Sequence, residues 1–218
     1  KKKIMKKIIL STVAFLAFGY ANAQEAVVTE TDAVTYGLTE GDWWAEGYFK
    51  YSSTSDETSS VESTFSFTPQ IGYMLNSKWG VGGYLSFGGQ SYNEVNGRNL
   101  DSSGSWGIGA FARHYFLSLG KHKSFQAYGE IGLGYSALTT DYNNGIDSTT
   151  DSALNARVNV GLNYFFTPKF AATFVLANIL SYNSNNNDTA EDTNDLTVNI
   201  NLYENIFATP QFGLLYKW

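Results

Sequence analysis

The chain has 218 residues, of which 43% are hydrophobic, 16% aromatic and 16% charged, and its formal net charge is −6. It contains no cysteine, which excludes a disulfide scaffold, a thiolate zinc site and a cysteine nucleophile. After the first segment, the most apolar stretch is the 11 residues 170–180, well short of the roughly 18 that a spanning helix needs. We therefore expect no membrane-spanning helix.

The first residues have the pattern of an export signal. Five lysines lie within the first seven residues, an apolar stretch follows at 8–18, and Ala21-Asn22-Ala23 supplies the small residues that a signal peptidase recognises. We predict a cleaved signal peptide at residues 1–23; an N-terminal anchor is less favoured because the apolar stretch is short. Cleavage would leave nine basic against 20 acidic residues, a net charge of −11, and so acidic a chain is not expected to bind nucleic acid.

From Trp43 onward, apolar and polar residues alternate. Phe65, Phe67 and Ile71, for example, are separated by small polar residues. A period of two is typical of strands that have one apolar and one polar face. We predict eight strands near residues 42–52, 62–75, 79–91, 104–117, 124–138, 152–166, 170–182 and 196–218.

The connections between these strands alternate between short turns and long polar loops. The loops hold 12 of the 20 acidic residues, whereas the turns hold Lys78, Lys121, Lys123 and Lys169 and no acid. In an up-and-down meander all short turns lie at one end, which is the asymmetry of outer-membrane barrels. The predicted fold is all-β: an eight-stranded antiparallel up-and-down transmembrane β-barrel at residues 42–218, after a short periplasmic segment at 24–41.

A soluble eight-stranded barrel would show the same alternation with its faces reversed, so the composition of the polar face decides between the two. That face consists largely of Gly, Ser, Thr, Asn and Gln, whereas a surface in water should be rich in Lys and Glu. The apolar face is almost free of charge, and its aromatic residues gather toward the strand ends, as in the two girdles of a membrane barrel. We therefore predict that the apolar face contacts lipid.

Five charged residues fall on the strand face assigned to the lumen: Glu46, Lys50, Arg113, Glu130 and Arg157. The interior of an eight-stranded barrel is just wide enough for side chains to fill. We expect these groups to neutralise one another across the lumen as a plug, because an unpaired buried charge is costly; hydrated groups in a loosely filled barrel are the alternative. Glu204 falls on the lipid face in this register, which indicates either a position at the outer interface or a bulge.

The chain ends with apolar residues at alternate positions, Phe212, Leu214, Tyr216 and the terminal Trp218. This ending resembles the C-terminal signal by which the outer-membrane assembly machinery selects barrels. The stretch FTPQIGYMLNSKWGVGGYLSF resembles the second hairpin of the outer-membrane β-barrel domain family of Bacteroidetes, small porin-like proteins similar in shape to the OmpX and OmpA barrels. The resemblance covers residues 41–218 and implies a Gram-negative outer membrane with lipid and lipopolysaccharide as surroundings.

Little in the sequence favours an enzyme. The only histidines are His114, near a strand end, and His122, in a turn, so a catalytic triad has no obvious base. The acidic loops lack a calcium-loop pattern, so we expect no catalytic residues, metal or cofactor. We predict a monomeric, non-enzymatic barrel with extracellular loops and periplasmic termini, which has a structural or surface-display role through its acidic loops. A narrow passive channel for small solutes is the alternative.

Overall fold

The computed structural model describes residues 36–53, 61–92, 100–142, 147–186, 191–199 and 211–218. The predicted signal peptide and Glu204 lie outside these residues. The described strands are β1 (Trp43–Ser53), β2 (Val61–Met74), β3 (Trp79–Tyr92), β4 (Leu100–Leu119), β5 (Phe125–Tyr142), β6 (Thr149–Phe165), β7 (Phe170–Asn186), β8 (Thr193–Val198) and β9 (Gln211–Lys217).

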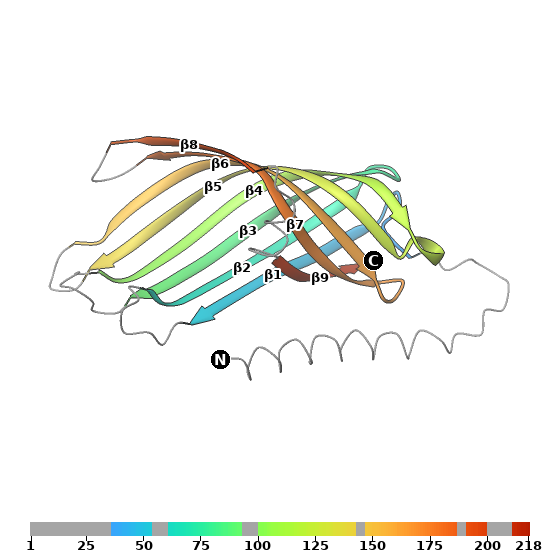
Figure 1. Ribbon diagram of the computed structural model, residues 1–218, viewed down its shortest axis with the longest axis horizontal. Helices are drawn as coiled ribbons and strands as arrows, with labels where there is room; N and C mark the ends of the chain where they lie inside the picture. Colours follow the sequence, from blue (N-terminus) through green and yellow to red (C-terminus); the bar gives the residue numbers. More distant parts are fainter. Residues whose placement is uncertain (1–35, 54–60, 93–99, 143–146, 187–190, 200–210) are drawn as a thin grey trace.

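The strands form one antiparallel sheet that closes on itself (Figure 1). Neighbours in the chain pair in order from β1 to β7, and β9 then pairs with both β7 and β1. Two main-chain bonds between Trp43 and Trp218, of 3.0 and 3.3 Å, hold the ends of the closing pair together. The predicted all-β, eight-stranded antiparallel barrel is confirmed.

The predicted final strand at 196–218 is wrong in one respect, because the structure describes it as two segments. Both β8 and β9 pair with β7, but Leu180 faces Val198 whereas Val175 faces Gln211. The two pairs are thus five positions apart on β7 but 13 positions apart on the last strand, which breaks the regular register. In Figure 1, β8 projects with the end of β7 beyond the ring of strands.

Several strands extend further toward the loop end than the alternation of residues predicts. β4 begins at Leu100, β5 continues to Tyr142, and β7 continues to Asn186. Apart from Leu100 and Tyr142, the added residues are polar on both faces, so their hydropathy does not distinguish strand from loop. Their ladders nevertheless continue, with Thr139 facing Thr150 and Asn185 facing Thr193.

The short connections all lie at one end of the barrel (Figure 1). They are residues 75–78 and 166–169 and the segment around the 3-10 helix Lys121–Lys123. Among the described residues, no helix is long and apolar enough to cross a membrane.

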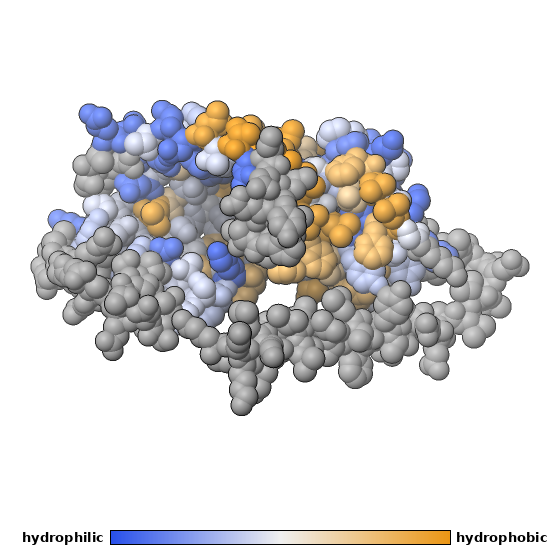
Figure 2. Space-filling view, in the orientation of Figure 1, coloured by the Kyte–Doolittle hydropathy of each residue, from blue (hydrophilic) through white to orange (hydrophobic). Residues whose placement is uncertain are grey.

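Apolar side chains cover the outer face of the barrel. Phe49, Leu85, Ile108 and Leu133, one from each of four strands, are all between 43% and 63% exposed. Figure 2 shows hydrophobic residues over the visible wall and hydrophilic residues toward the loop end. The interior, by contrast, holds the buried cluster of Leu38, Trp44, Met74, Tyr84, Phe111, Tyr115, Tyr128, Phe165, Ala171 and Leu215. An apolar outer band with polar ends is the surface that a bilayer requires.

Lumen glycines make room for the buried rings. Trp44 faces Gly72 across the β1–β2 pair, and a Cβ at Gly72 would overlap the Trp44 ring. The ring is fully buried and packs on Phe111 at a centroid distance of 6.2 Å, so it has little space to move. This glycine is therefore required by close packing.

We predict that Gly72→Ala destabilises the barrel by about 1–3 kcal/mol, the usual cost of overpacking a filled interior. Urea unfolding of the purified protein in detergent, followed by electrophoretic mobility, measures the effect. Gly104→Ala is the matched control, because an added Cβ there meets nothing within 4 Å. Equal stability of the two variants would contradict the packing argument.

Candidate functional site

The centre of the lumen is occupied by Arg113, whose side chain is fully buried. Its guanidinium donates to both oxygens of Glu46, at 2.5 and 3.1 Å, and to Oε2 of Glu130, at 2.6 and 3.0 Å. A fifth contact, of 3.4 Å, reaches the hydroxyl of Tyr115. A guanidinium has five N–H donors, so every donor of Arg113 has a partner.

The strand register explains why these groups meet. Arg113 on β4 directly faces Glu130 on β5, and Glu130 faces Asn159 on β6. Glu46 reaches the same place from β1, at a distance of 67 residues along the chain from Arg113. The cluster thus ties β1 to β4 and β5 across the lumen.

Aromatic rings surround the central guanidinium. Its Cζ lies 4.0 Å from the ring centroid of Tyr128, 5.3 Å from that of Phe111 and 5.7 Å from that of Trp44. The Tyr48 hydroxyl lies 3.3 Å from that of Tyr128 and thereby extends the network. Cations are attracted to aromatic faces, more strongly where water is excluded. The rings therefore help to compensate the desolvation of Arg113.

Arg157 lies at the edge of this cluster. Arg157 is bonded to Glu130 by a longer contact, of 3.5 Å, and its side chain is 24% exposed. It faces Gly132 on β5, two residues nearer the loop end than Glu130, and its Cζ stacks 4.2 Å from the Tyr84 ring centroid. Its Nε is buried without a hydrogen-bond partner in the described part of the chain.

Of the five predicted lumen charges, the structure brings four together: Glu46, Arg113, Glu130 and Arg157. It does not place Lys50 in an ion pair with any described residue. Lys50 lies on the same face of β1 as Glu46 but four residues nearer the loop end, and it is exposed. Among the described residues Lys50 thus stands apart from the four paired charges, because β1 carries it past the carboxylates.

Sequence reasoning missed the aromatic residues of the lumen. The alternation of the sequence could have located them, because each ring is an even number of residues from a lumen charge on the same strand. Trp44 and Tyr48 flank Glu46, Phe111 and Tyr115 flank Arg113, and Tyr128 precedes Glu130 by two residues. The small polar residues that dominate this face do not by themselves predict such rings.

A chain segment before β1 closes the turn end of the lumen. Leu38 is buried there and donates its N–H to Oε1 of Gln126 at 2.8 Å, while Gln126 donates back to the Leu38 carbonyl at 3.3 Å. Lys217 donates to the Gly37 carbonyl at 2.5 Å and to Asp42 at 2.9 Å. This closure had not been expected from the sequence.

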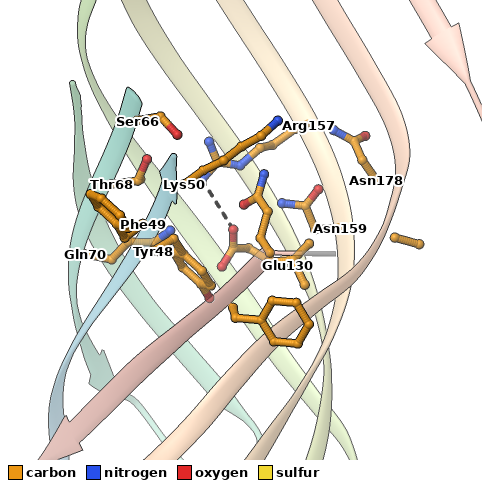
Figure 3. Close-up of a pocket in the computed structure, with 14 residues that line it drawn as sticks. Tyr48, Phe49, Lys50, Ser66, Thr68, Gln70, Glu130, Arg157, Asn159 and Asn178 are labelled. Carbon is orange, nitrogen blue, oxygen red and sulfur yellow. Dashed lines mark hydrogen bonds and ion pairs between the residues drawn. The ribbon is translucent and has the colours of Figure 1, made fainter. Parts of the chain in front are cut away.

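Above the cluster, on the side of the loops, lies a cavity of about 510 Å³. Figure 3 shows Lys50 and Arg157 over Glu130 in this cavity. Further lining comes from Tyr48, Phe49, Ser66, Thr68, Gln70, Asn159, Val175, Ala177, Asn178, Gln211 and Phe212.

Neither histidine lines the cavity. His114 packs against Trp79 with the rings tilted, at a centroid distance of 4.5 Å, and His122 stacks on Tyr36 at 6.0 Å. Within the described ranges, no three His, Cys, Asp or Glu residues are grouped so that they could hold a metal ion.

The C-terminal residues alternate in exposure. Phe212, Leu214, Tyr216 and Trp218 are between 37% and 66% exposed on the outer face, whereas Leu215 is fully buried.

Comparison with known proteins gives a family match over most of the chain. A family profile described as outer membrane protein beta-barrel domain matches residues 11–203. No curated protein matches.

Among solved structures, similar ones include OprG of Pseudomonas aeruginosa (15% identity, TM-score 0.48, 86% of this chain and 99% of that chain). The N-terminal barrel of OprF from the same organism has 16% identity and a TM-score of 0.43, over 83% of this chain and 100% of that chain. Ail of Yersinia pestis has 14% identity and a TM-score of 0.44, over 82% and 99%.

Removing the central cation should strongly destabilise the barrel. We expect Arg113→Ala to cost about 3–5 kcal/mol, because it leaves two buried carboxylates without their main partner. Urea unfolding of the refolded protein measures the loss. Lys78→Ala, which removes a positive charge from an exposed turn, should change stability little. An unfolding midpoint for Arg113→Ala equal to that of Lys78→Ala would show that the cluster is not structural.

Proposed function

Because the chain belongs to the outer membrane protein beta-barrel domain family, we propose that it is a non-enzymatic barrel with a closed lumen, which displays its hairpins at the cell surface. It is a small outer-membrane β-barrel protein. The observation that carries the proposal is the fully partnered guanidinium of Arg113 at the centre of the lumen.

A closed lumen is supported at two levels along the barrel axis. The ion pairs of Glu46, Arg113 and Glu130 cross the middle, where all three side chains are at most 3% exposed. Leu38 and Gln126 obstruct the turn end. Passage of a hydrated ion would require both layers to separate, and breaking the central pairs would leave buried charges uncompensated.

Surface display is supported by the strand extensions at the loop end. The Thr139 and Thr150 hydroxyls lie 3.1 Å apart across β5 and β6, and Asn185 bonds to Thr193 and Asp195 across β7 and β8 at 3.2 Å each. Paired polar strands of this kind give exposed segments a defined shape, and binding residues are often carried on such segments above a rigid scaffold.

The outward row of Phe212, Leu214, Tyr216 and Trp218 is the part of this barrel that we assign to recognition by the assembly machinery. These side chains are exposed on β9 and just after it. The proposal places the turn end in the periplasm and the hairpins outside the cell. We assign the protein to the Gram-negative envelope as a monomer in lipid and lipopolysaccharide.

A narrow passive channel is the second candidate, and the cavity of about 510 Å³ favours it. The cavity extends from the loop side as far as Glu130, where the ion pairs of the Arg113 cluster end it.

Conductance separates the two candidates. We predict that the purified wild-type protein is silent in planar bilayers. Arg113→Ala should give small steps that favour cations, because two unpaired carboxylates would then attract water and cations into the lumen. Lys78→Ala should be as silent as the wild type. Steps in the wild type of the size seen for Arg113→Ala would favour the passive channel.

The orientation can be tested with single cysteines, because the chain has none of its own. In intact cells, Asp147→Cys at the loop end should react with a membrane-impermeant maleimide. Lys169→Cys at the turn end should react only after the outer membrane is permeabilised; both native residues are exposed. If only the turn-end cysteine were labelled in intact cells, the turn end would lie outside the cell, and the proposed orientation would be wrong.

A further inference from the structure

We propose that the cavity on the loop side of the Arg113 cluster binds a small organic monoanion, which is held through its carboxylate between Lys50 and Arg157. The proposal goes beyond surface display and does not depend on it. It rests on the charge balance of the lumen, on the donors of Arg157 that Glu130 does not take, and on the cavity's size.

The charge balance of the lumen leaves one cation unmatched. The five lumen charges comprise three cations, Lys50, Arg113 and Arg157, and two carboxylates. Arg113 contacts three of the four carboxylate oxygens, and only Oε1 of Glu130 is bonded to Arg157, at 3.5 Å. Lys50 has no ion pair among the described residues. A single negative charge in the cavity would therefore complete the balance.

The cavity wall also holds polar groups without partners. Gln70 is only 7% exposed, and its Oε1 has no hydrogen-bond partner in the described part of the chain. The buried Nε of Arg157, a donor, likewise has no hydrogen-bond partner among the described residues. Asn159, also 7% exposed, lines the cavity beside them. The Gln70 oxygen is an acceptor and can bond only to a donor, so it does not itself contact a carboxylate. The N–H donors of Arg157 that Glu130 does not take can bond to one, since the side chain is 24% exposed and has one hydrogen bond, to Glu130, among the described residues.

The size and the remaining lining narrow the ligand class. A volume of about 510 Å³ lies within the usual range for small-molecule sites. Tyr48, Val175 and Ala177 add apolar surface to the wall. A carboxylate attached to a compact apolar group matches both parts of this wall, and a monoanion matches the single unmatched charge better than a dianion does.

The probe for this site is sodium benzoate, which carries one carboxylate on a compact ring. In isothermal titration calorimetry with the refolded protein, at low chloride and neutral pH, we expect saturable binding of benzoate. Benzamide, which has nearly the same shape but no charge, should bind at least about tenfold more weakly. Equal binding of the two, or no saturable binding of benzoate, would overturn the proposal.

Two variants locate the site. Lys50→Gln should weaken benzoate binding at least about tenfold without unfolding the barrel, since Lys50 makes no ion pair with a described residue. Arg157→Gln should weaken it similarly, and if that variant fails to fold, Lys50→Gln alone decides. Lys78→Gln removes an equal charge at the turn end and should leave the affinity unchanged. Unchanged affinity in Lys50→Gln would place benzoate elsewhere and overturn the proposal.

Discussion

A charged side chain inside this barrel has lipid behind its strand, so it must be neutralised by groups within the lumen, on the neighbouring strand or across the tube. Arg113 meets this constraint with two carboxylates, a tyrosine hydroxyl and three aromatic faces. The contacts come from β4 itself, from its neighbour β5, and from β1, which lies three strands away around the ring. The same interactions that compensate the buried charge thus fix the distance between opposite walls and fill the lumen.

The rest of the interior is built around this centre by the pairing of large and small residues. Trp44 is accommodated because Gly72 faces it, and Tyr128 because a Cβ at Gly161 would overlap its ring. Among the described residues, the cavity begins on the loop side of Glu130. The buried rings and the ion pairs thus lie toward the turn end, and the cavity lies toward the loop end.

Much of the fold follows from the sequence because the period of two is imposed by the strand itself. The ring of strands, the turns and the outward apolar face follow from that period and from the composition of the two faces. The split of the last strand into β8 and β9 does not follow, because its residues continue to alternate whereas the register to β7 changes. The longer hairpins were missed because both of their faces are polar.

The central site was predictable in its members and less so in its geometry. The parity that places Glu46, Arg113 and Glu130 on one face of their strands is readable from the chain. Which cation pairs with the carboxylates depends on how far neighbouring strands are shifted along one another. That shift leaves Lys50 on the loop side of the cluster. The same shift creates the unmatched charge in the cavity.

The central claim is that neighbouring residues on each strand point alternately to lipid and to a filled lumen. Trp43 and Trp44 test it most directly, because they are adjacent on β1 but 45% and 0% exposed. Two variants, each retaining one of these tryptophans with the other four replaced by phenylalanine, would be reconstituted in vesicles of brominated phospholipid. The account predicts strong quenching of Trp43 fluorescence and little of Trp44. Equal quenching of both, or stronger quenching of Trp44, would contradict it.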